Sequence, residues 1–288
     1  MRSSGEPRHG TPPVAMTIAG SDSGAGAGLQ ADLKAFSALG VFATTVVTAV
    51  TAQSTAAVAG VEVVPPEMVD LQLRCVLDDM AVAAVKTGML GSSAVVELVG
   101  SWAARGALPN LVVDPVLVSS TGRPLLDAAG PRAYVERLLP HAVVLTPNLR
   151  EAETLCGLEA GTIADRDAMA DAARRLADLG PRVVVLKGGH LGGDDSPDVV
   201  VDEGSVSVLE ATRVASANTH GTGCTLSAAI AAGLARGLAP IDAVERAKAF
   251  VGRAIAGAAS WRLGAGHGPL DPFGWSEGEP ARPEGDRA

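Results

Sequence analysis

Residues 218–224, Asn-Thr-His-Gly-Thr-Gly-Cys, run directly into Thr-Leu-Ser-Ala-Ala-Ile-Ala-Ala-Gly-Leu at 225–234. Two glycines permit a turn in which backbone N–H groups converge, and the helix behind them adds unpaired amides and a positive dipole end. Such an arrangement binds anions. A thiol at the mouth of the helix, Cys224, would be stabilised as thiolate and could take a proton near neutral pH, as phosphoryl transfer to an alcohol requires. A Gly-rich turn before a core helix, with Cys224 as a packing residue, explains the stretch equally well.

Valine-rich runs alternate with Ala- and Leu-rich stretches along the chain of 288 residues. This alternation is typical of an α/β domain with a mostly parallel sheet covered by helices. We expect strands at 14–20, 41–50, 58–64, 81–86, 111–114, 142–146 and 182–187, then a hairpin of 199–202 with 205–209. Helices are expected at 28–39, 66–80, 92–105, 150–156, 167–179, 222–236 and 240–261.

No change in composition divides residues 14–274, so we expect one domain there. Residues 1–13 are polar and Pro-rich, and residues 275–288 include Glu-Gly-Glu-Pro-Ala-Arg-Pro, so both ends are expected to be disordered.

The net charge of −9 and the lack of a basic stripe argue against a nucleic-acid partner. The three cysteines, Cys75, Cys156 and Cys224, lack the spacing of a disulfide framework or a zinc site. No apolar run has the length of a membrane span, and the first residues lack a signal-peptide core. We therefore expect a soluble, cytoplasmic protein without a membrane partner.

Polar residues follow the predicted strands at the end where ligands bind in open α/β sheets. They are Ser21-Asp22, Thr51 to Gln53, Lys86-Thr87, Asp114, Asn148, Lys187 and Asn218. We expect these side chains to line one cleft.

Two familiar nucleotide motifs are absent or incomplete. Gly26-x-Gly28-x-x-Ala31 imitates a dinucleotide fingerprint, but no acidic residue lies between Asp32 and Glu62 to hold a ribose. A Walker A loop is excluded because the chain contains no Gly-Lys dipeptide. If the protein transfers phosphate, the helix mouth at residues 221–224 must bind it.

Asn148 and Glu151 can be read in two ways. Their spacing of three places both side chains on one helix face, where they could hold magnesium waters or phosphate. The same residues suit helix capping, which we favour when the pair is considered alone. Lys187, one of four lysines, ends a buried strand and could neutralise phosphate oxygens; a solvated strand end is the alternative.

The primary amide of Gln53 offers donors and an acceptor that suit the edge of an aminopyrimidine ring, although a turn hydrogen bond is equally compatible. His190 and His220 could contact phosphate or substrate, or be ordinary loop residues.

Together these segments resemble the ribokinase-like superfamily, and more closely its hydroxymethylpyrimidine/phosphomethylpyrimidine kinases of thiamine synthesis. The matching segments cover about residues 14–269 and are Ala19-Gly-Ser-Asp22, Gly26-Ala-Gly-Leu-Gln-Ala-Asp-Leu-Lys34, Thr48-Ala-Val-Thr-Ala-Gln53, Lys86-Thr-Gly-Met-Leu90, Asp114-Pro-Val116, Thr146-Pro-Asn-Leu-x-Glu151, Leu186-Lys-Gly-Gly-His190 and Asn218 to Cys224. As a set they are highly specific.

The resemblance implies a three-layer αβα sandwich that uses ATP and Mg²⁺ to phosphorylate the pyrimidine's hydroxymethyl group and then the monophosphate. It implies a catalytic role for Cys224, an anion hole at Gly221, Thr222 and Gly223, and a phosphate contact for Lys187. The remaining implied roles are pyrimidine binding by Gln53 with Gly20, Asp32, Thr51, Met89 and Val116, nucleotide or phosphate binding by Asp114, Asn148, Thr219 and His220, and magnesium binding by Glu151 and Asn148. It also suggests a homodimer.

One departure is the first turn, Ser21-Asp-Ser-Gly-Ala-Gly-Ala-Gly28, where family members often have Pro-Ser-Gly-Gly after the Asp. The alternative within the fold is a pyridoxal or pyridoxine kinase, although such kinases tend to lose the segments around Gln53 and His190. A non-catalytic regulator would be supported by loss of Cys224 or Lys187, and both are present. Gly-rich residues at 119–123 and 188–197 are expected to close over the site.

Overall fold

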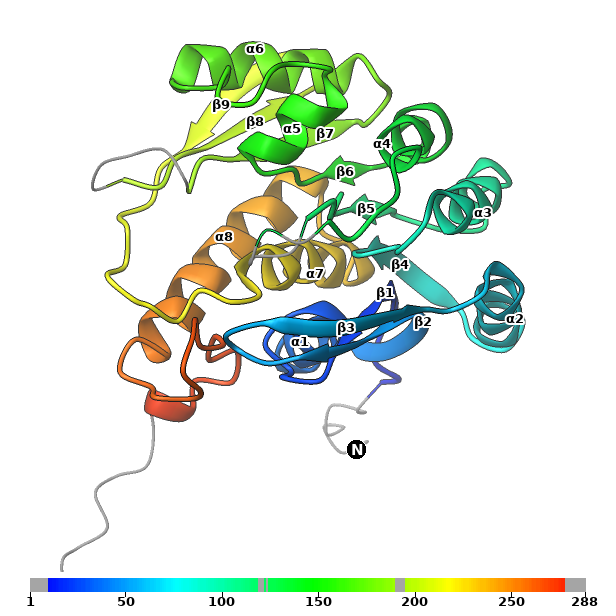
Figure 1. Ribbon diagram of the computed structural model, residues 1–288, viewed down its shortest axis with the longest axis horizontal. Helices are drawn as coiled ribbons and strands as arrows, with labels where there is room; N and C mark the ends of the chain where they lie inside the picture. The colour runs from blue at the N-terminus through cyan, green and yellow to red at the C-terminus, as the bar shows by residue number, and fades with distance from the viewer. Residues whose placement is uncertain (1–9, 119–121, 123, 190–194, 278–288) are drawn as a thin grey trace, which may run out of the picture.

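A nine-stranded, mostly parallel sheet forms the centre of the computed structural model, which describes residues 10–118, 122, 124–189 and 195–277 (Figure 1). The strand order is β3-β2-β1-β4-β5-β6-β7-β8-β9. The strands are β1 (Val14–Asp22), β2 (Phe42–Gln53), β3 (Val58–Val63), β4 (Val82–Thr87), β5 (Val112–Val113), β6 (Val144–Leu145), β7 (Val183–Lys187), β8 (Asp198–Asp202) and β9 (Ser205–Leu209). Only β3, β8 and β9 pair antiparallel, so the carboxyl ends of the other six strands share one edge.

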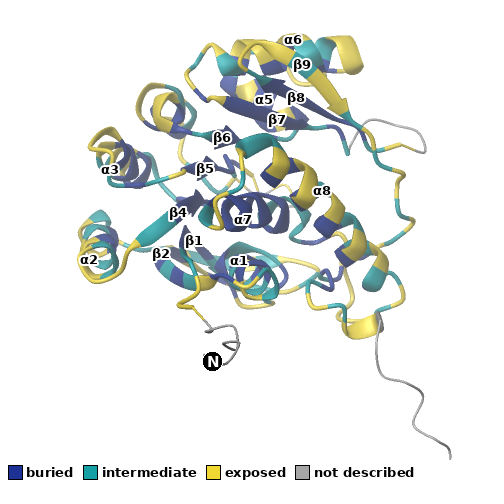
Figure 2. Cartoon of the chain, turned by 180° about the vertical axis from the view of Figure 1, so that it is seen from behind, coloured by how far each residue is buried: buried dark blue, intermediate teal, exposed yellow. Residues whose placement is uncertain are grey.

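Helices cover both faces of the sheet, and each face has its own apolar core (Figures 1 and 2). One core contains residues of α2 (Pro66–Leu77), α3 (Ser93–Ala104), α5 (Leu149–Leu155) and α6 (Arg166–Ala177). The other contains residues of α1 (Gly28–Ala38), α7 (Thr222–Ala235) and α8 (Pro240–Gly257). This arrangement confirms the expected three-layer αβα architecture.

Helix α7 lies deep in the molecule, and all its residues from Thr225 to Leu234 are buried (Figure 2). Its all-round apolar sequence follows from this position, because α1 and α8 pack against it as well as β4 and β1. The N-terminus of α7 is consequently fixed at the carboxyl edge of the sheet, where the predicted cleft lies.

The structure differs from the sequence prediction mainly where strands and helices end. Strands β1 and β2 continue to Asp22 and Gln53 because β1 pairs with β2 as far as Thr51, and β2 pairs with β3 as far as Gln53. A segment without predicted elements forms α4 (Gly130–Ala133), the π-helix η1 (Tyr134–Leu138) and the 3-10 helix η2 (Leu139–His141). Prolines 131 and 140 are typical of turns, so the sequence did not indicate helices in this segment. Its apolar side chains Tyr134, Leu138 and Leu139 are nevertheless fully buried.

Residues 275–277, which the sequence assigned to a disordered tail, form the 3-10 helix η3 (Trp275–Glu277). The ring of Trp275 stacks on that of Trp261, and Trp261 Nε1 donates to Ser276 Oγ at 2.8 Å. The other predicted disordered residues fall mostly at 1–9 and 278–288, outside the described residues, as do His190 and much of both predicted closing segments. The domain limits therefore stay predictions.

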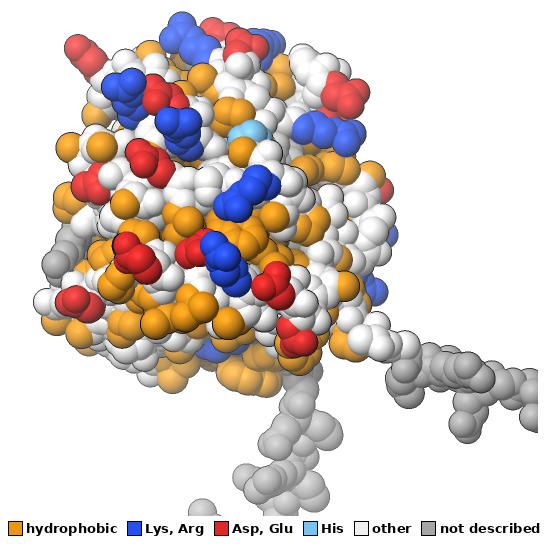
Figure 3. All heavy atoms as spheres, turned by 90° about the vertical axis from the view of Figure 1, so that its right-hand side faces the viewer, with side chains coloured by type: hydrophobic (Ala, Val, Ile, Leu, Met, Phe, Trp, Pro, Cys, Tyr) orange, Lys and Arg blue, Asp and Glu red, His pale blue; other side chains and the backbone are white. Residues whose placement is uncertain are grey.

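Positive and negative side chains are interspersed on the face that carries α2 and α3 in the described chain (Figure 3). Among the described helices α8 is the longest, with 18 residues, and none combines the length and apolar content of a membrane span.

Candidate active site

The N-terminus of α7 begins with a sharp turn at Gly221, which adopts the left-handed conformation with φ 83°. A side chain at this position would collide with the carbonyl oxygen of Gly26, so the turn requires glycine. The hydroxyl of Thr222 donates to the carbonyl of the exposed Thr219 at 2.7 Å and closes the turn. The N–H of Thr222 donates to the carbonyl of Thr219 at 3.3 Å. In a helix the other first-turn amides have no intrahelical acceptor, so the N–H groups of Gly223 and Cys224 are the ones that face an anion. The turn and the helix start thus have the predicted form, and anion binding there stays a prediction.

Cys224 lies half-buried in the first turn of α7. Burial raises the pKa of its thiol to about 11, even though the ammonium of Lys86 and the N–H of Gly28 act to lower it. This corrects the expected stabilised thiolate, because the loss of hydration outweighs the helix terminus and the neighbouring cation. The contact with Gly28 also explains the Gly-rich turn at residues 26–28, which brings the start of α1 to the sulfur.

Lys187 reaches the same helix terminus from the end of β7. Its Nζ lies 3.2 Å from the position that a Cβ atom on Gly223 would take, and it donates to Asp114 Oδ1 at 3.0 Å. Asp114 is buried and also accepts hydrogen bonds from Thr146 at 3.2 Å and Ser227 at 3.4 Å. In the structure the carboxylate of Asp114 holds Lys187 beside the start of α7, and the expected binding of nucleotide or phosphate by Asp114 stays a prediction.

A second lysine, Lys86, lies fully buried near Cys224 and forms an ion pair with Asp32. Lys86 Nζ donates to both carboxylate oxygens of Asp32, at 3.0 and 2.8 Å, and the hydroxyl of Thr17 donates to Oδ2 at 2.6 Å. The attraction of Asp32 raises the pKa of Lys86, although burial alone would lower it. With no exposed surface, Asp32 does not reach a substrate, which corrects its predicted role. Lys86 and Thr87 were expected to line the cleft with the other strand-end residues; both are fully buried, which corrects that expectation.

Asn148 and Glu151 form a complete capping box at the start of α5. Asn148 Oδ1 accepts from the N–H of Glu151 at 2.9 Å, and Glu151 Oε2 accepts from the N–H of Asn148 at 2.8 Å. Burial raises the pKa of Glu151 to about 7; Lys187 acts to lower it and Asp114 to raise it. The capping interpretation is confirmed, and magnesium binding by the pair stays a prediction.

The described residues contain no cluster of three or more His, Cys, Asp or Glu side chains suited to a metal ion. The capping box uses Glu151 Oε2 and leaves Oε1 outside the cap. A single carboxylate oxygen suits a Mg²⁺ ion that keeps most of its water molecules and shares phosphate oxygens, rather than an ion bound by protein groups alone. A cation nearby would also return the Glu151 carboxyl to its charged form.

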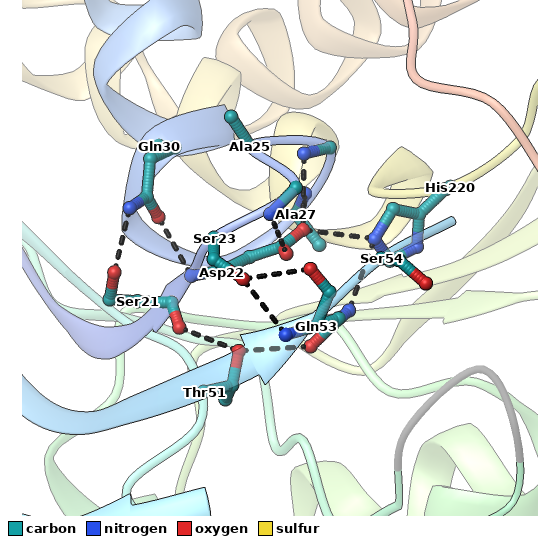
Figure 4. Close-up of polar contacts among 12 residues, drawn as sticks. Ser21, Asp22, Ser23, Ala25, Ala27, Gln30, Thr51, Gln53, Ser54 and His220 are labelled. Atoms are coloured by element: carbon teal, nitrogen blue, oxygen red, sulfur yellow. Dashed lines mark hydrogen bonds and ion pairs between the residues drawn. The ribbon is translucent and has the colours of Figure 1, made fainter. Parts of the chain in front are cut away.

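Gln53, at the end of β2, lies beside the imidazole of His220 and the carboxylate of Asp22 (Figure 4). His220 Nε2 lies 3.0 Å from Asp22 Oδ2 and 3.2 Å from Gln53 Nε2. Asp22 also accepts the N–H groups of residues 24, 26 and 27 and thereby organises the first turn. His220 was expected to contact phosphate or substrate, or to be an ordinary loop residue; its buried ring faces the predicted pyrimidine-binding amide.

Other predicted substrate residues lie close by. The hydroxyl of Thr51 donates to the carbonyl of Ser21 at 2.9 Å, and Met89 Sδ lies 3.0 Å from where a Cβ atom on Gly20 would be. Val116 is half-buried, two residues beyond Asp114. A groove of about 450 Å³ opens beside Gln53 and is lined by residues that include Lys34, Trp261, Leu263 and Trp275.

Comparisons with known proteins agree with this geometry. A family model described as phosphomethylpyrimidine kinase matches residues 22–271. A hydroxymethylpyrimidine/phosphomethylpyrimidine kinase of Rhizobium meliloti is 45% identical over 260 residues, which cover 90% of this chain and 97% of the relative. A thiamine biosynthetic bifunctional enzyme of Arabidopsis thaliana is 46% identical over 91% of this chain, which spans 50% of that enzyme.

A solved structure points to the same fold. The pyridoxal kinase of Staphylococcus aureus in complex with AMP-PCP and pyridoxal is 35% identical, with a TM-score of 0.83. The match covers 92% of this chain and 95% of that one.

Proposed function

The chain belongs to the phosphomethylpyrimidine kinase family, and we propose that Cys224, Lys187 and the amides of residues 221–224 carry out its phosphoryl transfer. The protein uses ATP to phosphorylate 4-amino-5-hydroxymethyl-2-methylpyrimidine and then the monophosphate, in thiamine diphosphate biosynthesis. The observation that carries the residue assignment is the position of Lys187 Nζ, 3.2 Å from a Cβ built on Gly223. A cation and a helix N-terminus thereby face one point, as a transferring phosphoryl group requires.

In the proposed reaction the substrate hydroxyl oxygen attacks the γ-phosphorus of ATP. The new O–P bond forms while the bond from phosphorus to the leaving oxygen of ADP breaks, and the hydroxyl proton passes to Cys224 Sγ. Lys187 and the amides at the start of α7 oppose the negative charge that spreads over the phosphoryl oxygens. With a thiol pKa of about 11, only about one molecule in 10⁴ carries the thiolate at pH 7, so turnover rises with pH.

We assign Mg²⁺ to Asn148 and Glu151, which would hold it through water molecules beside the phosphates. When bound, the ion neutralises phosphate oxygens. One support is Glu151 Oε1, the carboxylate oxygen that takes no part in the capping box. The other is that Glu151 lies close to Lys187 and Asp114, at the end of the sheet where phosphate binding is proposed. We also assign a contact with nucleotide phosphate to Thr219, and the support is its exposed position beside the turn.

We assign pyrimidine binding to the amide of Gln53, with Gly20, Thr51, Met89 and Val116 around the ring. The support is the place of Gln53 at the end of β2, the bond from the Thr51 hydroxyl to the carbonyl of Ser21 on β1, and the proximity of Gly20 to Met89. A homodimer in the cytoplasm completes the proposal and rests on the family resemblance. Sedimentation at micromolar concentration tests the dimer, and a mass equal to that of one chain would contradict it.

The competing substrate is pyridoxal, because the fold is shared with pyridoxal kinases. The decisive measurement is kcat/KM for the pyrimidine alcohol, its monophosphate and pyridoxal with the same enzyme preparation. We expect both pyrimidines to be preferred over pyridoxal by about tenfold or more, because the exocyclic amino group pairs with the Gln53 amide. A preference for pyridoxal would overturn the substrate assignment.

A further inference from the structure

The imidazole of His220 is held firmly between segments that are distant in sequence. The ring lies directly over Gly26, where any side chain would collide with it. The N–H of His220 donates to the carbonyl of Gly268 at 3.0 Å, and the ring is buried. Its Nε2 faces both Asp22 and Gln53 (Figure 4). A side chain fixed in this way can impose an orientation on its neighbours.

The contact with Asp22 determines where the imidazole carries a proton. Burial alone would raise the pKa of Asp22, but the hydrogen bonds from His220 and from the N–H groups of Ala27 and Gly24 lower it. The carboxylate is therefore charged and acts only as an acceptor. Because Oδ2 lies 3.0 Å from His220 Nε2, that nitrogen must be a donor, an N–H.

The amide of Gln53 must then be turned so that its oxygen faces His220. The atom 3.2 Å from His220 Nε2 is assigned as the amide nitrogen, and two N–H groups cannot bond to each other. At the other end of the amide, the atom assigned as Oε1 lies 3.3 Å from Thr51 Oγ1, whose single proton already goes to the carbonyl of Ser21. Exchanging the oxygen and nitrogen of the amide removes the contact between two N–H groups. The one proton of His220 Nε2 is then shared between Asp22 Oδ2 and Gln53 Oε1, and Thr51 Oγ1 accepts from Gln53 Nε2.

We propose that His220 is a positioning residue that fixes the Gln53 amide with Oε1 toward the imidazole and Nε2 toward Thr51, and so sets the substrate-binding edge of the amide. The inference rests on the proposed contact between Gln53 and the aminopyrimidine. In this orientation Oε1 keeps one lone pair and Nε2 keeps one N–H. These complement an exocyclic amino group and the adjacent ring nitrogen, two groups that a pyridine ring does not present side by side. His220 thereby acts on specificity.

Two substitutions at residue 220 separate this role from simple packing. The amide nitrogen of glutamine can occupy the place of imidazole Nε2, whereas asparagine is too short to reach it. We expect His220→Gln to keep the KM for the pyrimidine alcohol within about threefold of the wild type. His220→Asn is expected to raise that KM about tenfold, the loss of one oriented hydrogen bond. For both variants kcat and the KM for ATP should stay within about twofold.

The ratio of kcat/KM for the pyrimidine alcohol to kcat/KM for pyridoxal should fall about tenfold in His220→Asn and be retained in His220→Gln. A loss shared equally by pyrimidine and pyridoxal would overturn the inference. If His220→Asn does not fold, as judged by thermal unfolding, His220→Gln decides alone: a retained ratio supports the role of the N–H, and a tenfold fall overturns it.

The Gln53→Ala variant distinguishes failure of the inference from failure of the proposed function. If Gln53→Ala leaves the pyrimidine KM unchanged, Gln53 does not bind the ring and the proposed substrate contact fails. If it raises KM and His220→Asn adds no further increase in the double variant, His220 acts through Gln53, as inferred. Additive effects of the two substitutions would show that His220 acts independently of Gln53 and would overturn the inference.

Discussion

Lys187 Nζ donates to Asp114 Oδ1 at 3.0 Å, a contact between residues 73 positions apart that closes one side of the anion site. The carboxylate is buried and held by two hydroxyl groups, so the ammonium has a fixed direction toward the start of α7. If Lys187 binds phosphate as proposed, its long, flexible side chain is already oriented before the phosphate arrives.

Replacing Lys187 with methionine removes the cation while keeping most of the side-chain volume. We expect kcat to fall by about 10²–10³, because a preorganised charge no longer stabilises the transferring group. Lys248→Met is the matched control, since Lys248 pairs with Asp198 at 2.6 Å and its side chain is 17% exposed, against 16% for Lys187. Steady-state kinetics of both variants decide the point; equal losses would refute a specific role for Lys187.

Cys224→Ala should reduce kcat by about 10²–10³ and leave the dissociation constant for ATP within about threefold. Because burial raises the pKa of the thiol to about 11, wild-type kcat should rise with pH between pH 7 and pH 10, and the variant should lack that rise. Cys156→Ala, also at a half-buried cysteine, provides the control. Turnover measured across this pH range tests both statements, and near-normal kcat in Cys224→Ala would exclude the thiol as base.

Glu151→Gln should alter how stability depends on pH while keeping the helix cap, because glutamine also serves in a capping box. The folded-state pKa of about 7 exceeds the ordinary value of 4.5, so the folded protein binds more protons than the unfolded chain between these values. Wild-type stability therefore declines as pH rises from 4.5 to 7, by at most about 3 kcal/mol. The difference in thermal midpoint, variant minus wild type, should increase as pH rises from 4.5 to 7 and then level off. A constant difference would contradict the raised pKa.

Lys86→Met should destabilise the fold by about 3–5 kcal/mol, because it leaves the carboxylate of Asp32 buried without its counter-charge. The double substitution with Asp32→Leu should recover most of that loss, since an apolar pair needs no hydration. Urea unfolding of the two single variants and the double variant measures the coupling. If the double variant loses as much as the two single variants combined, the pair does not act as a unit.

The sequence predicted the layer architecture because Val-rich strands alternate regularly with Ala- and Leu-rich helices. A single cleft lined by the polar strand ends stays a prediction, except that Lys86 and Thr87 are fully buried. It could not place His220 or Asp32, because the partner of each side chain depends on tertiary contacts between distant segments. It also overestimated the acidity of the Cys224 thiol. A helix N-terminus is visible in the sequence, whereas the cost of burying the sulfur appears only once α7 is packed between α1 and the sheet.

The segment from α4 to η2 escaped prediction for a different reason. Prolines at 131 and 140 are typical of turns, and here both stand in the first turns of short helices. Lys86 carried the same signal as Lys187, a charge in a buried strand, but its interaction with Asp32 joins residues 54 positions apart and needs the β1–β4 pairing to form.

The close approach of Gly26 and Gly221 ties the formation of the turn before α7 to the order of protein synthesis. One half of this contact leaves the ribosome early, and the other follows only after the whole parallel sheet has been made. A nascent or truncated chain that ends before α7 therefore lacks this contact, however well its first strands are formed.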